Sequence, residues 1–242
     1  GWTIPAAPAP APISREEFAG RRRALAEGME DGGVLFAMGR DEAGLGSAPF
    51  AQSSNFRYLT GYTEPAATLV MAKRGGQVTE HLFVMPRDPS REVWDGTRLG
   101  AEGATRRTGI PARESDGMMT AALDSLLQGA TTLYTLTPEQ GRPYLSTEQQ
   151  VIQGLRQRHA SLTRVVDLSA RMQQLRQRKS PAELDMLRRA VFITTLAHRE
   201  AARLFLAGQD GQLVMDSFPA SGQLTTSPDD PETAITDSAA GA

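Results

Sequence analysis

The sequence of 242 residues contains no cysteine and only three histidines. The missing cysteine excludes disulfide bonds, thiolate metal sites and cysteine nucleophiles. The histidines, His81, His159 and His198, do not follow the H-E-x-x-H pattern or another close ligand spacing. Each is therefore interpreted as a surface or packing residue. The residues alone predict neither a metal site nor a cofactor.

Long apolar runs and a strong net charge are also missing. No stretch of about 18 apolar residues exists, so no transmembrane helix is expected. The start, GWTIPAAPAPAP, has neither a basic region nor a continuous apolar region, so no signal peptide is expected. The net charge of −2 argues against a nucleic-acid-binding surface. These absences predict a cytoplasmic protein with no membrane or nucleic-acid partner.

Common nucleotide and hydrolase motifs are absent as well. Gly39, Gly44 and Gly46 follow a strand-like run, but neither the dinucleotide-binding spacing nor a P-loop lysine occurs. No G-x-S-x-G nucleophile elbow is present. The residues alone therefore reveal no catalytic constellation.

What the sequence does contain is an alternation of strand-like and helix-like segments. The strand-like runs are residues 34–38, 67–74, 77–86, 131–137 and 164–168. Helical patterns cover residues 14–27, 101–109, 115–129, 147–158 and 169–178. Gly75-Gly76 between two strand patterns predicts a β-hairpin. Together these patterns predict an α/β fold with a mixed β-sheet flanked by helices.

Some local patterns predict finer features. Residues 14–17 and 147–150 have the spacing of a capping box. The arginine triplet at 21–23 is interpreted as a solvated helix face, with an anion site as the weaker alternative. The stretch SSNFRYLTGYTEP, residues 53–65, is interpreted as a strand that enters a turn.

The best-specified element is a long helix after Lys179. Ser180 is the expected N-cap, Pro181 and Glu183 suit the first turn, and Gly208 suits the end. About 26 residues at 1.5 Å rise give a helix of about 39 Å. Its apolar stripe must be buried on something, and we expect a homodimer interface there. The expected interface residues are Leu184, Leu187, Val191, Ile193, Ala197 and Leu204.

The stretch REVWDGTRLG, residues 91–100, is the most distinctive polar segment. A Trp on a glycine-containing loop beside charges is typical of a binding platform. The alternative is that Trp94 covers an edge of the core. Composition alone leaves both interpretations open.

The ends of the chain differ in composition from the rest. Residues 1–13 alternate Ala and Pro and predict an extended arm. Residues 209–242 carry six acidic residues and no Lys or Arg, and predict a flexible tail. Between them we expect an α/β domain at 14–170 and a connecting segment with the long helix at 171–208.

Four segments, in order, resemble the Xaa-Pro aminopeptidases (aminopeptidase P) of the creatinase/prolidase superfamily. They are FAQSSNFRYLTGYTEPAATLVM, FVMPRDPSREVWDGTRLGAEGA, VVDLSARMQQLRQRKSPAELDMLRRA and TTLAHREAAR. The resemblance covers roughly Ser14 to Arg203. It implies the family's N-terminal α/β domain, with a ribonuclease-H-like topology. It also implies that Trp94 and Arg98 lie on the substrate side of an active site, often that of a neighbouring subunit.

In that family a second, "pita-bread" domain removes an N-terminal residue that precedes proline. It holds two metal ions, often manganese, with two Asp, one His and two Glu. The sequence is expected to end before these ligands, so peptidase activity is left uncertain. We therefore predict a stand-alone or truncated N-terminal domain without its own metallopeptidase activity.

Two other hypotheses remain open. The first is a hydrolase with an unrecognised site around Trp94, Asp95, Arg98 and Arg57. The second is an interaction protein that dimerises through the long helix or captures aminopeptidase P subunits.

Overall fold

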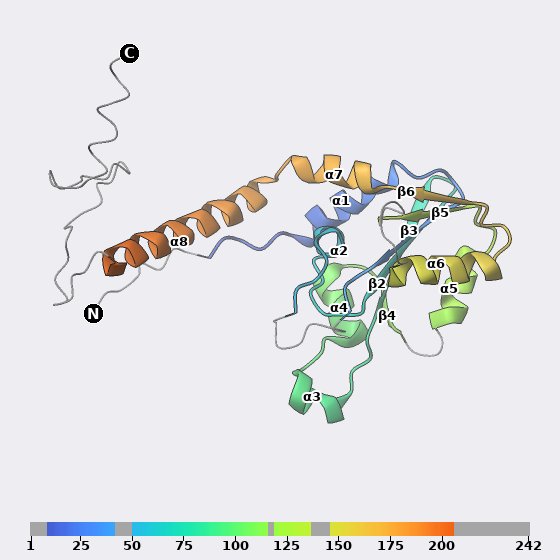
Figure 1. Ribbon diagram of the computed structural model, residues 1–242. Coiled ribbons are helices and arrows are strands. Elements are labelled where there is room, and N and C mark those ends of the chain that lie inside the picture. Colours follow the sequence, from blue (N-terminus) through green and yellow to red (C-terminus); the bar gives the residue numbers. More distant parts are fainter. Residues whose placement is uncertain (1–8, 42–49, 116–118, 137–145, 206–242) are drawn as a thin grey trace, which may run out of the picture. The chain divides into compact units, whose positions relative to one another are not determined.

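The computed structural model describes residues 9–41, 50–115, 119–136 and 146–205 (Figure 1). Residues 12–179 form one compact unit, and the chain from Ser180 onward belongs to another, so each is described by itself. Most of the expected arm, all of the tail and Gly208 lie outside the described residues.

A mixed six-stranded sheet forms the centre of the compact unit. Its strands are β1 (Gly33–Met38), β2 (Thr68–Arg74), β3 (Gln77–Val84), β4 (Ala112–Glu114), β5 (Thr132–Thr135) and β6 (Arg164–Asp167). They lie in the order β4-β3-β2-β1-β5-β6. The β1-β2 and β2-β3 pairs are antiparallel, whereas the other three pairs are parallel. The α/β fold with a mixed sheet flanked by helices is therefore confirmed.

Helices cover both faces of this sheet. The helices of this unit are α1 (Arg15–Ala26), α2 (Ser54–Thr60), α3 (Pro89–Asp95), α4 (Gly100–Thr108), α5 (Met119–Leu127), α6 (Thr147–Arg158) and α7 (Ser169–Gln177), of which α3 projects away from the sheet (Figure 1). One hydrophobic cluster joins α1, α2, α4 and α7 to the sheet, and a second joins α5 and α6 to it. Successive residues of β1 alternate between the clusters: Leu35 packs in the first and Phe36 in the second. Alternation of this kind follows from the two-residue period of a strand.

The expected hairpin is confirmed. Strands β2 and β3 pair from Thr68–Phe83 to Arg74–Gln77, which leaves Gly75 and Gly76 as the turn. Their φ angles are 55° and 75°. Glycine adopts such positive angles without the steric cost that a side chain would impose, so the sequence fits a two-residue turn of the primed type.

Ser14 caps α1 as expected, because its hydroxyl accepts a hydrogen bond from the amide of Glu17. The side chain of Glu17, however, pairs with Arg21. The second capping box was placed one residue too late. Ser146 is the N-cap of α6, and its partner in the box is Gln149.

The segment 53–65 is not a strand, and that prediction was wrong. Ser53 caps the short helix α2, and Gly61 ends it in the left-handed conformation with φ 66°. Phe56, Leu59 and Thr60 are the buried side chains, which is a helical spacing. Trp94 likewise lies on α3 and not in a loop, because Asp88 caps a helix that begins at Pro89.

The arginine triplet is not a solvated face, so that prediction was wrong for two of its three residues. Arg21 and Arg22 are buried, whereas Arg23 is exposed. The Arg21 guanidinium lies 4.1 Å from the ring centre of Tyr58 and donates to the carbonyl of that residue. Arg22 donates to the Leu59 carbonyl at 2.9 Å and pairs with Glu80 on β3. These two residues connect α1 to α2 and to the sheet.

The long helix α8 (Pro181–Phe205) is present, and its predicted start is confirmed. The Ser180 hydroxyl accepts from the Glu183 amide, and the Glu183 carboxylate accepts from the Ser180 amide at 2.9 Å. In the part of the chain that the structure describes, no helix is long and apolar enough to cross a membrane.

Candidate functional site

The segment that carries Trp94 and Arg98 connects β3 to α4 through α3. Arg87 binds the carboxylate of Glu92 through two hydrogen bonds of 2.8 and 2.9 Å, which fixes the start of α3 to the end of β3. These bonds lower the pKa of the Glu92 carboxyl from its ordinary value. Gly96 then ends the helix with φ 80° and ψ 164°, a conformation that is essentially restricted to glycine.

Glu64 joins this segment to the first of the family-like segments. One carboxylate oxygen accepts from the Leu99 amide at 2.9 Å, just before α4 begins. The other accepts from the Tyr62 hydroxyl at 2.7 Å. Tyr62 is 1% exposed, and its pKa is raised by burial and then by Glu64. The two sequence segments, more than 30 residues apart, therefore meet at one carboxylate.

The backbone around Glu64 is held from the opposite side by Gln52. Its amide nitrogen donates to the Glu64 carbonyl at 2.8 Å. Its amide oxygen accepts from the amides of Arg40 and Ser53 at 2.6 and 2.7 Å. Gln52 thus links the end of β1, the start of α2 and the turn at Glu64. Sequence reasoning placed a turn at Glu64 and both residues in the family-like stretch FAQSSNFRYLTGYTEPAATLVM, but it gave neither side chain a role.

Arg98 lies next to this junction. The guanidinium approaches the Met85 sulfur at 3.5 Å, and the side chain is partly buried. The structure describes the backbone of Trp94 on α3 but not its side chain, nor that of Asp95. The substrate-side role of Trp94 and Arg98 is therefore an untested prediction, as is the hydrolase site that would add Arg57 on α2.

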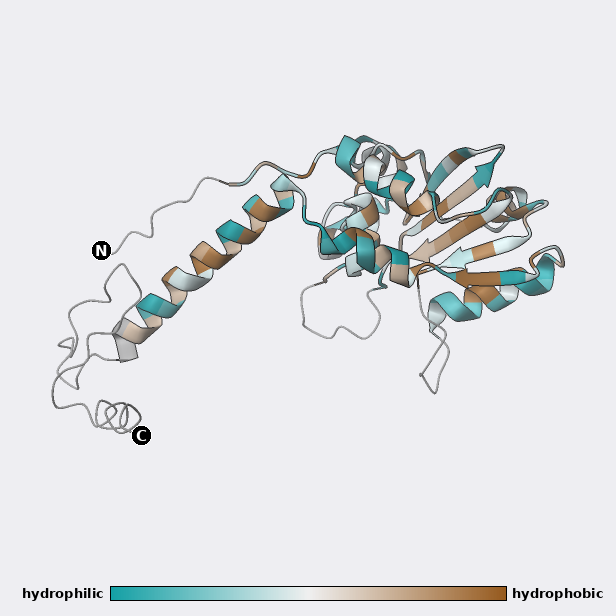
Figure 2. Cartoon of the chain, turned by 90° about the horizontal axis from the view of Figure 1, so that it is seen from above, coloured by the Kyte–Doolittle hydropathy of each residue, from teal (hydrophilic) through white to brown (hydrophobic). Residues whose placement is uncertain are grey.

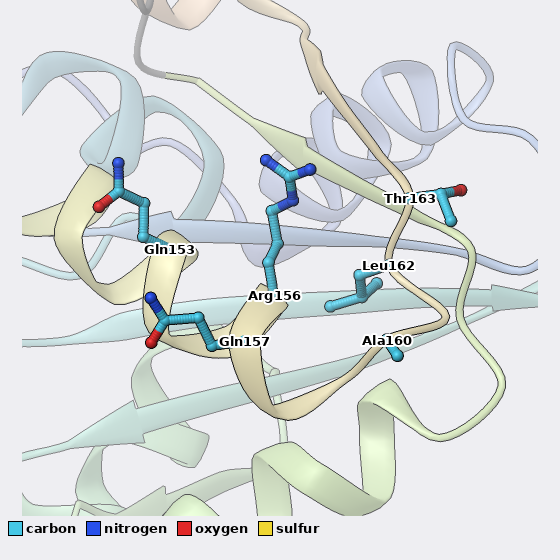
Figure 3. Close-up of a pocket in the computed structure, with 6 residues that line it drawn as sticks. All are labelled: Gln153, Arg156, Gln157, Ala160, Leu162 and Thr163. Atoms are coloured by element: carbon cyan, nitrogen blue, oxygen red, sulfur yellow. The ribbon is translucent and has the colours of Figure 1, made fainter.

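Two cavities among the described residues are compared with the candidate site. The larger, about 530 Å³, lies between the last turns of α6 and the segment leading into β6 (Figure 3). Its lining residues are Gln153, Arg156, Gln157, Ala160, Leu162 and Thr163. None of them belongs to the family-like segments around Trp94 and residues 53–65.

The smaller cavity, about 310 Å³, opens at the ends of β1 and β5 and includes Glu148, Ser53 and Arg176 in its lining. The Glu148 carboxylate accepts from the Thr135 hydroxyl at 2.6 Å and from the Met38 amide at 3.4 Å. Glu148 therefore ties the start of α6 to two neighbouring strands. The sequence did not indicate these contacts of Glu148, because an acidic residue in the first turn of a helix is common and is explained by its favourable interaction with the helix dipole.

The described residues do not fit the paired metal ions that the family implies. His159 binds Asp124 at 2.8 Å, and His198 contacts the Thr194 carbonyl of its own helix. His81 is half-buried, and its pKa is lowered by burial and then by Arg113. Across the described ranges, no three His, Asp or Glu side chains gather closely enough to hold a metal ion. No metal-dependent step is therefore assigned to these residues.

Hydrophobic residues recur along α8 (Figure 2), and several large apolar side chains of this helix are exposed. The most exposed are Val191 at 65%, Ile193 at 50% and Leu187 at 49%. Phe192, which the predicted stripe omitted, is 43% exposed and lies about 100° around the helix from both of its neighbours. Leu184 is also exposed, as is Ala197, whereas the Leu204 side chain lies outside the description.

Comparisons with known proteins agree with the resemblance in the sequence. Residues 18–134 match the family model described as "Aminopeptidase P, N-terminal domain". The Xaa-Pro aminopeptidase of Escherichia coli (strain K12) is 32% identical over 196 residues, which cover 78% of this chain and 44% of the relative.

Solved structures show the same partial match. Aminopeptidase P from E. coli with the inhibitor Pro-Leu aligns with a TM-score of 0.65 and 31% identity, over 78% of this chain and 44% of that chain. Proline aminopeptidase P II from Yersinia pestis aligns with a TM-score of 0.68 and 26% identity, over 79% of this chain and 45% of that chain. The chain thus spans about 44% of the length of these relatives, in their N-terminal part. At residues 18–134 the chain therefore contains a domain that matches the aminopeptidase P N-terminal domain.

Proposed function

We propose that this chain is an aminopeptidase P N-terminal domain that acts in assembly and has no metallopeptidase activity of its own. Its partner is a second copy of the chain, bound through α8. The observation that carries this proposal is the exposure of large apolar side chains along α8: Leu187 and Val191, one turn apart, lie on one side, and Ile193 lies on another, each about half or more exposed. Large apolar side chains gathered on one element are typical of an interaction surface.

The opposed helix dipoles favour an antiparallel pair of identical helices. Charge along α8 does not set the orientation, because the first turns combine Glu183 and Asp185 with Arg188 and Arg189, and Arg199 near the end is followed by Glu200. Capture of a different aminopeptidase P subunit is the competing outcome.

The first test is a peptidase assay on the 242-residue chain with Mn²⁺ and an Xaa-Pro-Yaa peptide. We expect no release of the first residue, because the described residues gather no ligand set for paired ions. The E. coli enzyme is the positive control. Turnover that a chelator abolishes would contradict the proposal.

The second test is the oligomeric state by light scattering at roughly 50 µM, where weak interfaces become populated. We expect a dimer, and we expect Leu187→Arg and Val191→Arg, on one side of α8, to convert it to a monomer, because a buried unpaired charge is costly. Gln173→Arg, at an exposed position of α7, adds the same charge outside α8 and should leave the dimer intact. A monomeric parent protein would rule out the self-pairing.

A second candidate function is a part in Xaa-Pro aminopeptidase activity, favoured by the 32% identity to a protein of that name. In this case Trp94 and Arg98 face the substrate of a catalytic domain, and manganese is bound there and not by the residues described here. Chelator-sensitive turnover in the first test would favour this candidate. The cytoplasmic location also stays a prediction.

A further inference from the structure

We infer that Glu64 is a positioning residue, which holds the segment 96–99 and thereby sets the place of Arg98 and of the end of α3. The functional meaning of this inference rests on the proposed substrate-side role of Trp94 and Arg98. The positioning itself depends only on the contacts of Glu64 and can be measured without any activity.

The first step of the inference is that Glu64 is anchored before it reaches the segment. Its carboxylate accepts from the hydroxyl of Tyr62, a fully buried side chain in the core cluster. The amide of Tyr62 in turn donates to the Thr60 hydroxyl at 3.0 Å, and that hydroxyl donates to the Phe56 carbonyl. The carboxylate is therefore fixed from the core side, through α2.

The backbone of Glu64 is fixed as well. Gln52 donates to its carbonyl, and Ala66, two residues later, donates its amide to the Arg40 carbonyl at 2.9 Å. Ala66 has a φ of 51°, which is unfavourable for a residue other than glycine. A non-glycine residue in this conformation persists where its surroundings enforce it, so the turn is rigid.

The opposite partner, the segment 96–99, is tied mainly to α3: the Gly96 amide donates to the Glu92 carbonyl, and the Arg98 amide bonds to the Glu92 carboxylate. Gly96 breaks α3, and Leu99 enters α4 without a side-chain cap. The bond from the Leu99 amide to Glu64 links this junction to the core, and a carboxylate beside the first turn of α4 also complements the helix dipole. Removal of the carboxylate should therefore release the segment 96–99 and leave the core in place.

The test is amide hydrogen exchange at Leu99 in the full chain. We expect Glu64→Ala to speed this exchange by about tenfold or more, as a lost bond to a charged acceptor implies. Glu64→Gln should stay near the parent, because its amide oxygen still accepts from Leu99.

Glu102→Ala is the matched control, since Glu102 is an exposed acid of α4 that pairs with Arg106. It should leave Leu99 exchange at the parental rate. If Glu64→Ala does not fold, Tyr62→Phe replaces it, because it loosens the carboxylate from the core and should raise Leu99 exchange to a smaller extent. A folded Glu64→Ala or Tyr62→Phe variant with parental Leu99 exchange overturns the inference. A missing dimer or an active peptidase would instead count against the proposed function alone.

Discussion

Replacement of Arg22 by alanine is expected to lower the free energy of unfolding by about 3 kcal/mol, because it breaks a buried ion pair by removing one partner. Arg22 is 2% exposed, and its Nε lies 2.9 Å from the Glu80 carboxylate, which is 20% exposed. The contact is an ion pair and not a well-aligned hydrogen bond, since Nε has no hydrogen-bond partner in the structure. The substitution leaves Glu80 without its cation and the Leu59 carbonyl without its donor.

Chemical and thermal unfolding followed by circular dichroism measure this loss. For a domain of this size, it corresponds to a fall in Tm of about 9 °C. Arg23→Ala, on the same helix but exposed, should cost less than about 0.5 kcal/mol. Arg22→Met keeps most of the apolar stem and should recover part of the loss. Equal stabilities of the Arg22→Ala and Arg23→Ala variants would show that the buried pair contributes nothing.

Gly61→Ala is expected to have a similarly large effect, about 3 kcal/mol, for two separable reasons. Gly61 ends α2 with φ 66°, which disfavours any side chain. A Cβ there would also lie 2.6 and 2.8 Å from two ring carbons of Phe18 on α1. The first effect is local strain in the backbone, and the second is overpacking between two helices.

Gly129→Ala isolates the backbone effect. Gly129 has φ 69°, but a Cβ at this position meets nothing within 4 Å, so the expected loss is about 1 kcal/mol. The ring contribution follows from a double-mutant cycle with Phe18→Ala, in which the coupling should favour the double variant by about 1–2 kcal/mol. If Gly61→Ala and Gly129→Ala unfold at the same denaturant concentration, the contact with the Phe18 ring does not contribute to the destabilisation at Gly61.

Local chemistry made the hairpin predictable from sequence, because Gly75 and Gly76 leave few alternatives for the turn. Likewise, Ser180, Pro181 and Glu183 specified the start of α8. The helix α2 was missed although Ser53 and Gly61 are good start and stop signals. Phe56 and Tyr58 favour a strand by intrinsic preference, and burial by α1 and the sheet overrides that preference.

The candidate site was less predictable, because its contacts join segments distant in sequence. The Glu64 carboxylate accepts from the Leu99 amide, 35 residues away in the sequence. The Glu148 carboxylate accepts from the Met38 amide, 110 residues away. Nothing in the local pattern of either acid indicates these partners. The family resemblance located the segments that meet at Glu64, but the hydrogen bonds that join them emerge from the fold.

The position of β1 in the sheet has a consequence for synthesis on the ribosome. On one side β1 pairs with β2, the next strand along the chain, where Met38 pairs with Thr68. On the other side β1 pairs with β5, where Gly33 pairs with Thr132, 99 residues further along the chain. At about 5–20 residues per second, translation leaves that edge without its partner for about 5–20 s. An open strand edge invites pairing with other nascent chains. Chaperone binding during elongation should therefore peak before β5 emerges from the exit tunnel.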